Sequence, residues 1–196
     1  MADGAVPSPG SATLTGPQAF AVGKAVMVAT SGPHAGDCND KEIPAGVTPL
    51  VQVLIAEQGV PNGDVCISDA GVPEGGAGSF LVLAIATPEW AKSVGDPAAA
   101  PLSQSLVAGT YTISNEHEND EDPCMLQGGG SAYLYLSNLT ATDALSIAMS
   151  GTVTLESVSA GAVAGRFDVV MGGPYGTADA SPPPSLSGSF NATACP

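Results

Sequence analysis

Basic side chains are the scarcest feature of this chain. Lysine and arginine together number 4 in 196 residues, against 19 aspartates and glutamates, and the formal net charge is −15. The basic residues Lys24, Lys41, Lys92 and Arg166 are also scattered along the sequence. A surface that binds nucleic acid or anionic lipid requires clustered basic residues. The composition therefore excludes both of these partners and predicts an acidic, well-solvated surface.

Long apolar runs and an export signal are also missing. The strongest apolar run, at residues 80–87, is far shorter than the roughly 20 residues of a membrane-spanning helix. The chain opens without the charged and apolar regions of a secretory signal. Residues 1–11 are instead rich in Gly, Pro and Ser, as expected of a tether just after a cleavage or lipid-attachment site. We therefore expect an exported protein whose signal is not part of this sequence, with a flexible tether at residues 1–11 and a single domain at 12–196.

Motifs that would indicate an enzyme are absent. No G-x-S-x-G nucleophile elbow occurs, and the glycine-rich segments at residues 75–78 and 128–130 lack the lysine of a phosphate-binding loop. His117 and Glu118 begin like a zinc-protease motif, but the second histidine of that motif is missing. We expect no catalytic residues and no resident cofactor.

The cysteines favour disulfides over a metal site. The chain has 4 cysteines and no C-x-x-C spacing, which zinc ribbons and thioredoxin-like sites require. An even number in a lysine-poor chain with strand-like patterning favours two disulfides, although three connectivities are open. We favour Cys38–Cys66, which flanks an apolar strand, and Cys124–Cys195, which would fix the C-terminus. The alternative is four buried thiols in a cytosolic protein.

Strand signals recur along the whole domain. Residues 50–56 and 80–86 are almost entirely apolar, which is typical of central strands covered on both faces. Further strand-like segments lie at residues 12–15, 21–30, 64–68, 109–114, 132–136, 152–158, 163–171 and 186–194. One helix is expected at residues 87–95, with Thr87 as its N-cap, Pro88 in its first turn and Gly95 at its end. Trp90 would pack this helix against a sheet edge, with ligand stacking as the alternative role.

The C-terminal third shows the clearest pattern. In residues 152–158, Val153 and Leu155 should face inward while the intervening residues face solvent. Two later segments share the pattern apolar-x-Gly-x-Phe-Asp/Asn, at residues 163–168 and 186–191. In an antiparallel pairing each phenylalanine would cover the glycine opposite. The whole chain is thus expected to form an all-β fold of about nine to eleven strands, an antiparallel β-sandwich or flattened barrel with one short helix.

These C-terminal segments carry a resemblance. The runs starting at Gly151, Gly165 and Leu186 and ending at Cys195 resemble the C-terminal β-hairpins of secreted proteins and lipoproteins from myxobacteria-like, high-GC bacteria. The resemblance covers about the last third of the chain. It implies a cell-envelope or extracellular location and no catalytic residues.

Two acidic segments are the candidate ligand-binding positions. Clustered carboxylates and amides supply the six to eight oxygen ligands that calcium takes. The candidate metal ligands are Asp37, Asn39, Asp40, Glu118, Asp120 and Asp122. Neither segment fits an EF-hand, because Lys41 and Glu42 stand where a ligand and a glycine are required. The alternative is a solvated loop without an ion.

The sequence thus leads to two hypotheses about function. The first is a non-enzymatic extracellular or cell-envelope protein that acts by surface contact, either tethered or as a subunit of a surface assembly with a protein or surface partner. The second is a calcium- or carbohydrate-binding module that uses the acidic segments together with Trp90 and the tyrosines at 111, 133 and 135.

Overall fold

The structure is a computed structural model. The part of the chain that it describes contains nine strands and one short helix. The described residues are 7–29, 43–60, 78–93, 101–114, 130–135, 145–174 and 185–195. The elements in chain order are β1 (Ser11–Thr15), β2 (Val22–Ala29), β3 (Leu50–Glu57), β4 (Phe80–Ala86), α2 (Pro88–Ser93), β5 (Gly109–Ser114), β6 (Gly130–Tyr135), β7 (Leu145–Val158), β8 (Ala162–Pro174) and β9 (Ser185–Ala194).

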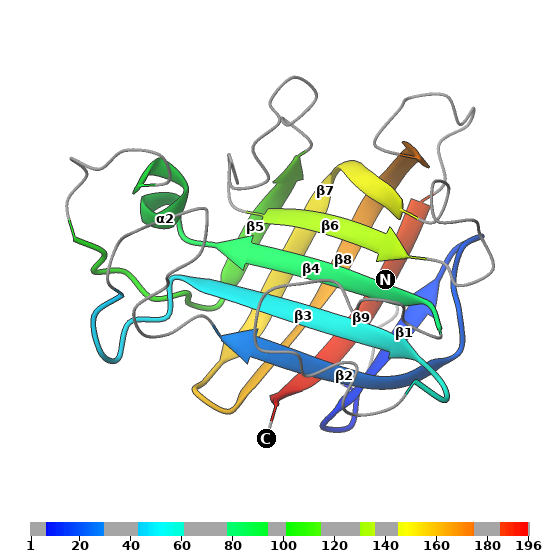
Figure 1. The fold of residues 1–196 in the computed structure, drawn as a ribbon, viewed down its shortest axis with the longest axis horizontal. Helices are drawn as coiled ribbons and strands as arrows, with labels where there is room; N and C mark the ends of the chain where they lie inside the picture. The colour runs from blue at the N-terminus through cyan, green and yellow to red at the C-terminus, as the bar shows by residue number, and fades with distance from the viewer. Residues whose placement is uncertain are drawn as a thin grey trace.

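The strands form two crossed layers. One layer contains β2, β3, β4 and β6, and the other contains β5, β7, β8, β9 and β1. Figure 1 shows the first layer running across the view and the second rising steeply behind it. Strongly crossed layers of this kind are joined by strands that pass from one layer to the other.

Two long strands join the layers at opposite corners. The first residues of β7 pair with β6, and its later residues pair with β5. Residues 187–191 of β9 pair with β1, whereas Thr193 and Ala194 pair with β2 in parallel. All other strand pairs are antiparallel. The sheet is therefore nearly closed into a flattened barrel, which confirms the predicted fold class.

The main core lies between the layers. Inward residues of β3 and β4, such as Val53, Ile55 and Leu83, pack there with Phe167 and Phe190 from the second layer. The opposite face of β3 and β4 is also buried, with Leu54, Phe80 and Val82 in a second cluster. Both strands are thus covered on two sides, as their near-continuous apolar sequences predicted.

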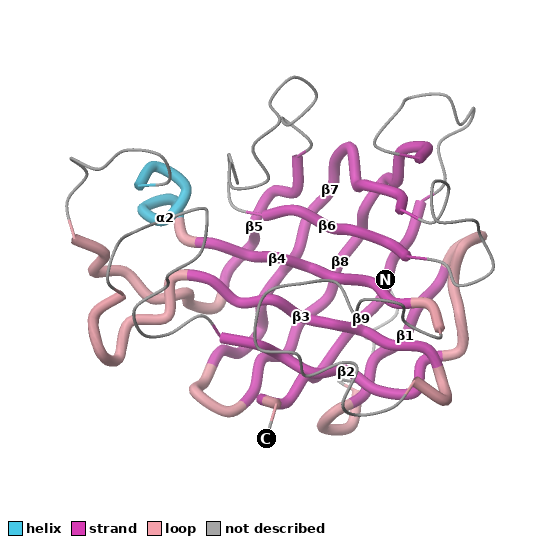
Figure 2. Tube along the Cα trace, in the orientation of Figure 1, coloured by secondary structure: helices cyan, strands magenta, loops and turns pink. Residues whose placement is uncertain are grey.

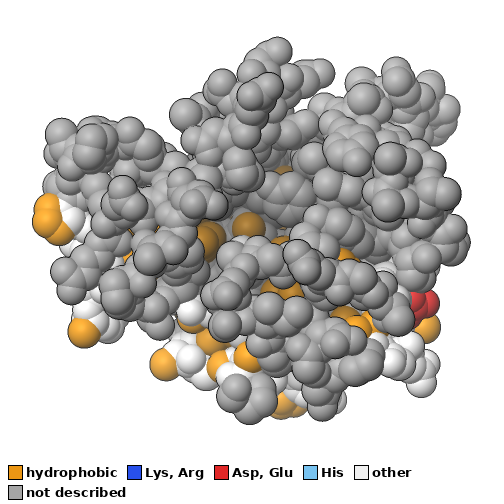
Figure 3. Space-filling model, viewed as in Figure 1, with side chains coloured by type: hydrophobic (Ala, Val, Ile, Leu, Met, Phe, Trp, Pro, Cys, Tyr) orange, Lys and Arg blue, Asp and Glu red, His pale blue; other side chains and the backbone are white. Residues whose placement is uncertain are grey.

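On the face seen in Figure 3, the described acidic atoms appear only at one margin.

The glycine–phenylalanine pattern of the C-terminal strands is realised across β8 and β9. Gly165 lies opposite Phe190, and Phe167 lies opposite Gly188. A Cβ atom added at Gly165 would stand 3.0 Å from Phe190 Cζ, and one added at Gly188 would stand 2.9 Å from Phe167 Cζ. Each ring therefore occupies the space that the facing residue leaves by lacking a side chain, which confirms the predicted pairing.

Helix α2 lies at one end of the molecule (Figure 2), where its Trp90 belongs to a small separate hydrophobic cluster. The Trp90 backbone N–H donates to Thr87 Oγ1 at 3.1 Å, so Thr87 is the N-cap as predicted. Trp90 is 4% exposed and packs with Ile43, Leu50 and Leu102. This burial confirms the packing role of the only tryptophan.

Some strand limits differ from the predicted ones. β7 begins at Leu145, seven residues before the predicted start at Thr152. Ser146, Ser150 and Gly151 concealed this extension, since small polar residues and glycine have low strand propensity. β1 begins at Ser11, and the Asn191 amide donates to the Pro7 carbonyl at 3.1 Å, so ordered contacts start before β1. The strand predicted at residues 64–68 lies outside the described residues.

Replacing Gly188 with alanine tests the packing of the Phe167 ring against the glycine opposite it. The new Cβ would meet the Thr13 carbonyl oxygen as well as the Phe167 ring. Overpacking of this kind costs about 1–3 kcal/mol, so Gly188→Ala should lower the free energy of unfolding by that amount. The control is Gly161→Ala, because a Cβ there meets nothing within 4 Å. Urea unfolding compares the two, and equal midpoints would contradict the prediction.

Candidate functional site

The outer side of the β5–β7–β8–β9–β1 layer presents an array of serine and threonine side chains. These residues alternate with the buried ones, so their hydroxyls face away from the core. We call this array the hydroxyl face. It consists of Ser11, Thr13, Thr15, Thr110, Thr112, Ser114, Ser150, Thr152, Thr154, Ser185, Ser187 and Ser189.

The strand registers align the array into rows. One row runs across the five strands as Thr112, Thr152, Asp168, Ser187 and Thr15. The next row is Thr110, Thr154, Arg166, Ser189 and Thr13. Neighbouring strands lie about 4.8 Å apart, and alternate residues on one strand lie roughly 6.8 Å apart. The face thus repeats hydrogen-bonding groups at short, regular intervals in two directions.

Several hydroxyls hold one another in place. Thr110 Oγ1 and Thr154 Oγ1 are 3.1 Å apart, and Thr13 Oγ1 and Ser189 Oγ are 3.0 Å apart. Each hydroxyl has one proton and two lone pairs, so a hydroxyl that bonds to its neighbour keeps capacity for an external partner. The cross-strand bonds also stabilise the sheet.

Charge is sparse on the hydroxyl face. Arg166 Nη1 lies 3.3 Å from Glu156 Oε1, so these two side chains neutralise each other. Asp168 is the other charged residue in the described rows. Because the pair is solvent-exposed, its net contribution to stability is small.

The described framework as a whole is also nearly neutral. Of the 19 acidic residues, four lie among the described residues: Glu57, Glu89, Glu156 and Asp168. Three of the 4 basic residues, Lys24, Lys92 and Arg166, lie there too. The framework therefore carries a formal charge of −1 out of −15. Nearly all of the negative charge belongs to the other segments of the sequence.

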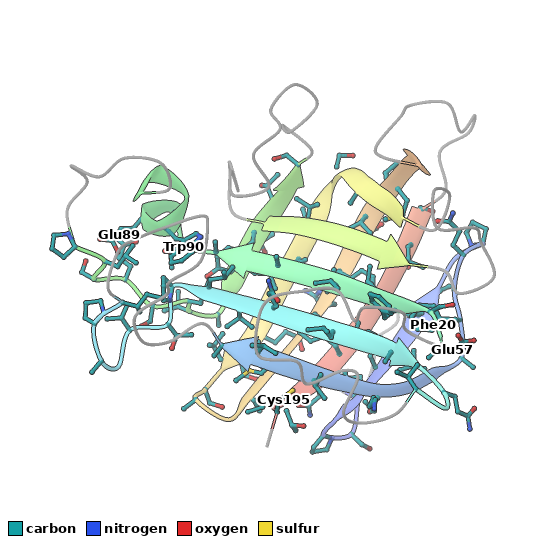
Figure 4. All side chains as sticks on the ribbon, in the orientation of Figure 1. Phe20, Glu57, Glu89, Trp90 and Cys195 are labelled. Atoms are coloured by element: carbon teal, nitrogen blue, oxygen red, sulfur yellow. The ribbon has the colours of Figure 1, made fainter. Side chains whose placement is uncertain are left out.

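The Glu89 carboxylate fastens the segment before β5 to helix α2. Its Oε2 atom accepts from the backbone N–H groups of Ser103 at 2.8 Å and Gln104 at 2.7 Å, and Oε1 accepts from Ser103 Oγ at 2.9 Å. The backbone N–H of Ser103, followed by that of Gln104, holds the pKa of Glu89 below its usual value. Figure 4 shows Glu89 beside the buried Trp90 at this end of the molecule. All its bonds run to the chain itself, so Glu89 has a structural role.

The predicted metal ligands fall outside the description. Asp37, Asn39, Asp40, Glu118, Asp120 and Asp122 all lie beyond the described residues, so the calcium hypothesis stays a prediction. Within the described ranges, no group of three or more His, Cys, Asp or Glu side chains could hold a metal ion.

The structure describes one of the four cysteines. Cys195 is disulfide-bonded. Cys38, Cys66 and Cys124 lie outside the described residues, so the predicted pairing is not tested.

Two of the aromatic residues proposed for carbohydrate stacking have described side chains, and neither of these two lies on the hydroxyl face. Trp90 belongs to the α2 cluster, and Tyr111 points its hydroxyl at the Val107 carbonyl, 2.8 Å away. The side chains of Tyr133 and Tyr135 lie outside the description. Contact through this face would therefore depend on hydrogen bonds.

The hydroxyl face was missed in the sequence, although a signal for it exists. The sequences Thr13-Leu-Thr15, Thr110-Tyr-Thr112, Thr152-Val-Thr154 and Ser187-Gly-Ser189 repeat a hydroxyl at alternate strand positions. Each repeat alone reads as an ordinary half-exposed strand. Only the strand order brings the four repeats into common rows.

Comparisons of the chain with protein-family models, curated proteins and solved structures find no match. Among the described residues, no helix has the length and apolar character needed to cross a bilayer.

The hydrogen bonds from Ser103 and Gln104 to the Glu89 carboxylate predict that the stability of the fold depends on pH. A carboxylate whose pKa is lowered by folding stabilises the fold at pH values above its unfolded-state pKa, which is near 4.5. This stabilisation is lost as the pH falls through the lower pKa of the folded state. Glu89→Gln should therefore be less stable than wild type at pH 7, and the difference should shrink as pH falls below 4.5. Thermal unfolding of both proteins across this range gives the comparison. A difference that is independent of pH would contradict the assignment.

Proposed function

We propose that this chain is a non-enzymatic protein of the cell envelope or extracellular space that acts by surface contact through the hydroxyl face. Its tether would be the part of residues 1–11 that precedes Pro7, because Pro7 and Gly10 already bond to Asn191 on β9. The ordered rows of hydroxyls across five strands carry the proposal. A sheet face that only has to be soluble can carry any polar residues. This face instead repeats one chemical group, the hydroxyl.

The chemistry of the face suits hydrogen-bonding contact better than catalysis. A serine or threonine hydroxyl becomes a nucleophile when an adjacent base activates it. Here Thr110 bonds to Thr154, and Thr13 bonds to Ser189. These partners orient the hydroxyl without removing its proton. The array therefore offers donors and acceptors of ordinary strength.

The charge distribution favours an uncharged partner surface. Arg166 and Glu156 pair with each other, and the chain as a whole carries a charge of −15. A polyanion would be repelled by that charge, and a polycation would be drawn to the acidic segments. A neutral polysaccharide matches the face, because its hydroxyls also donate and accept. Each direct hydrogen bond contributes only about 0.5–1.5 kcal/mol, so binding requires a polymer that makes many bonds at once.

Removing two hydroxyls tests the proposal. Thr112 and Thr152 face each other across β5 and β7, and valine has nearly the same shape as threonine. The double variant Thr112→Val/Thr152→Val should lose about 1–3 kcal/mol of binding free energy, which lowers the retention constant roughly fivefold or more. The measurement is retention on a panel of insoluble neutral polysaccharides: cellulose, chitin and curdlan.

The matched control is Thr48→Val, which removes a hydroxyl from the half-buried segment before β3. It should be retained as well as wild type. The proposal is wrong if wild type is retained on none of the panel, or if the double variant and the control are retained equally.

A further inference from the structure

Strand β5 leaves the edge of the second layer open at its first residues. In the part of the chain that the structure describes, β5 pairs with β7 from Gly109 to Ser114 and with no other strand. Figure 1 shows β5 at the margin of the layer that rises behind the first. Gly109 is exposed, and a Cβ atom built there would meet nothing within 4 Å. Because glycine has no side chain, this exposure is exposure of the backbone, which is then available to another strand.

An exposed apolar residue lies just before this edge. Val107 is 65% exposed, and it is the only large apolar side chain that is exposed among the described residues. The Tyr111 hydroxyl donates to the Val107 carbonyl at 2.8 Å and accepts from the Val107 N–H at 3.3 Å. The preceding Leu106 is 4% exposed, and its N–H donates to the Thr48 carbonyl at 2.9 Å. The backbone at Val107 is thus fixed while its side chain stays in water.

The sequence of β5 lacks the features that keep edge strands apart. Natural edge strands are protected by lysine, by proline or by a bulge. Residues 102–114 contain neither a proline nor a charged side chain, and the pairing with β7 has no register shift. The opposite edge strand, β1, is only 5 residues long and lies between Pro9 and Pro17. The layer therefore has one protected edge and one unprotected edge.

We propose that β5 pairs reversibly and in antiparallel fashion with β5 of a second copy of this chain, around a two-fold axis. Both copies then use the same surface, so that surface has to tolerate its own approach. The chain carries a charge of −15, which repels a second copy, whereas residues 102–114 and the facing residues 150–155 of β7 are uncharged. This edge is where two copies meet with little repulsion, and it offers no charge to a charged partner.

The antiparallel direction separates the acidic run that follows β5 in the sequence. This run, at residues 116–122, begins two residues after the strand ends. Antiparallel pairing brings the end of one β5 beside the start of the other, so the two acidic runs follow opposite ends of the contact. Parallel pairing would bring the ends of both strands together and increase the repulsion between the runs.

The contact is expected to be weak, because β5 has 6 residues and one strand pair buries less than the roughly 1,200 Å² of a stable interface. A two-fold axis perpendicular to the sheet would keep both hydroxyl faces on the same side of one continuous layer. A polymer would then meet twice as many hydroxyls. This consequence extends the proposed function, but the pairing itself does not depend on polysaccharide binding.

Sedimentation equilibrium of the full chain tests the pairing. Wild type should change from monomer towards dimer as its concentration rises from about 10 μM to about 1 mM. Raising NaCl from about 0.05 M to about 0.5 M should tighten the dimer by about fivefold or more, because salt screens the charge of −15.

Val107→Lys places a charge beside the edge and should weaken the dimer by about tenfold or more. The matched control is Ala19→Lys, at an exposed position between β1 and β2, which adds the same charge and should dimerise like wild type. Amide hydrogen exchange at high concentration should show added protection in β5 and none in β1.

A wild type that stays monomeric at about 1 mM in high salt overturns the proposal. So does equal dimerisation of Val107→Lys and wild type, and so does added protection at β1, which would mean that the copies meet through the other edge. Dimerisation through β5 without retention on any polysaccharide supports the pairing and contradicts only the proposed function.

Discussion

The two strands that belong to both layers are the constraint on which the architecture depends. β7 pairs first with β6 and then with β5, while β9 pairs with β1 and then with β2. Because each passes from one layer to the other, the crossed layers become a nearly closed barrel instead of two separate sheets. Closure leaves β1 and β5 as the sheet edges among the described strands. β7, β8 and β9 lie side by side through their own antiparallel pairs, and β5 and β1 extend this layer to form the hydroxyl face.

Core and charge are separated along the sequence. The described strands carry the apolar residues and almost no net charge, whereas the other segments carry fifteen of the 19 acidic residues. This separation lets a chain with a charge of −15 pack a dense core, since like charges do not have to approach one another within the sheets. Among the four described acidic side chains, Glu57 accepts the backbone N–H of Ser79 and Glu89 accepts those of Ser103 and Gln104, so both have a local structural role.

Much of the fold could be predicted because the relevant signals are local. Alternation placed Val153 and Leu155 inside, continuous apolar character marked β3 and β4 as doubly covered, and Thr87 marked the start of α2. The glycine–phenylalanine pattern even predicted a long-range pairing, because a bare glycine and a ring are complementary in only one register. The start of β7 was missed because Ser146, Ser150 and Gly151 interrupt its apolar residues, and pairing with β6 and β8 holds this part of the chain in the strand.

The sequence by itself determined that this chain forms strands, which face of several strands is buried, and that its four basic residues are scattered. The tertiary structure decided the order of the strands, the parallel seam between β2 and β9, and the alignment of four hydroxyl repeats into shared rows. The physical reason is the distance along the chain between the partners. Strands such as β1 and β9 lie at opposite ends of the sequence, and their register is set by core packing across the whole barrel, which no local pattern records.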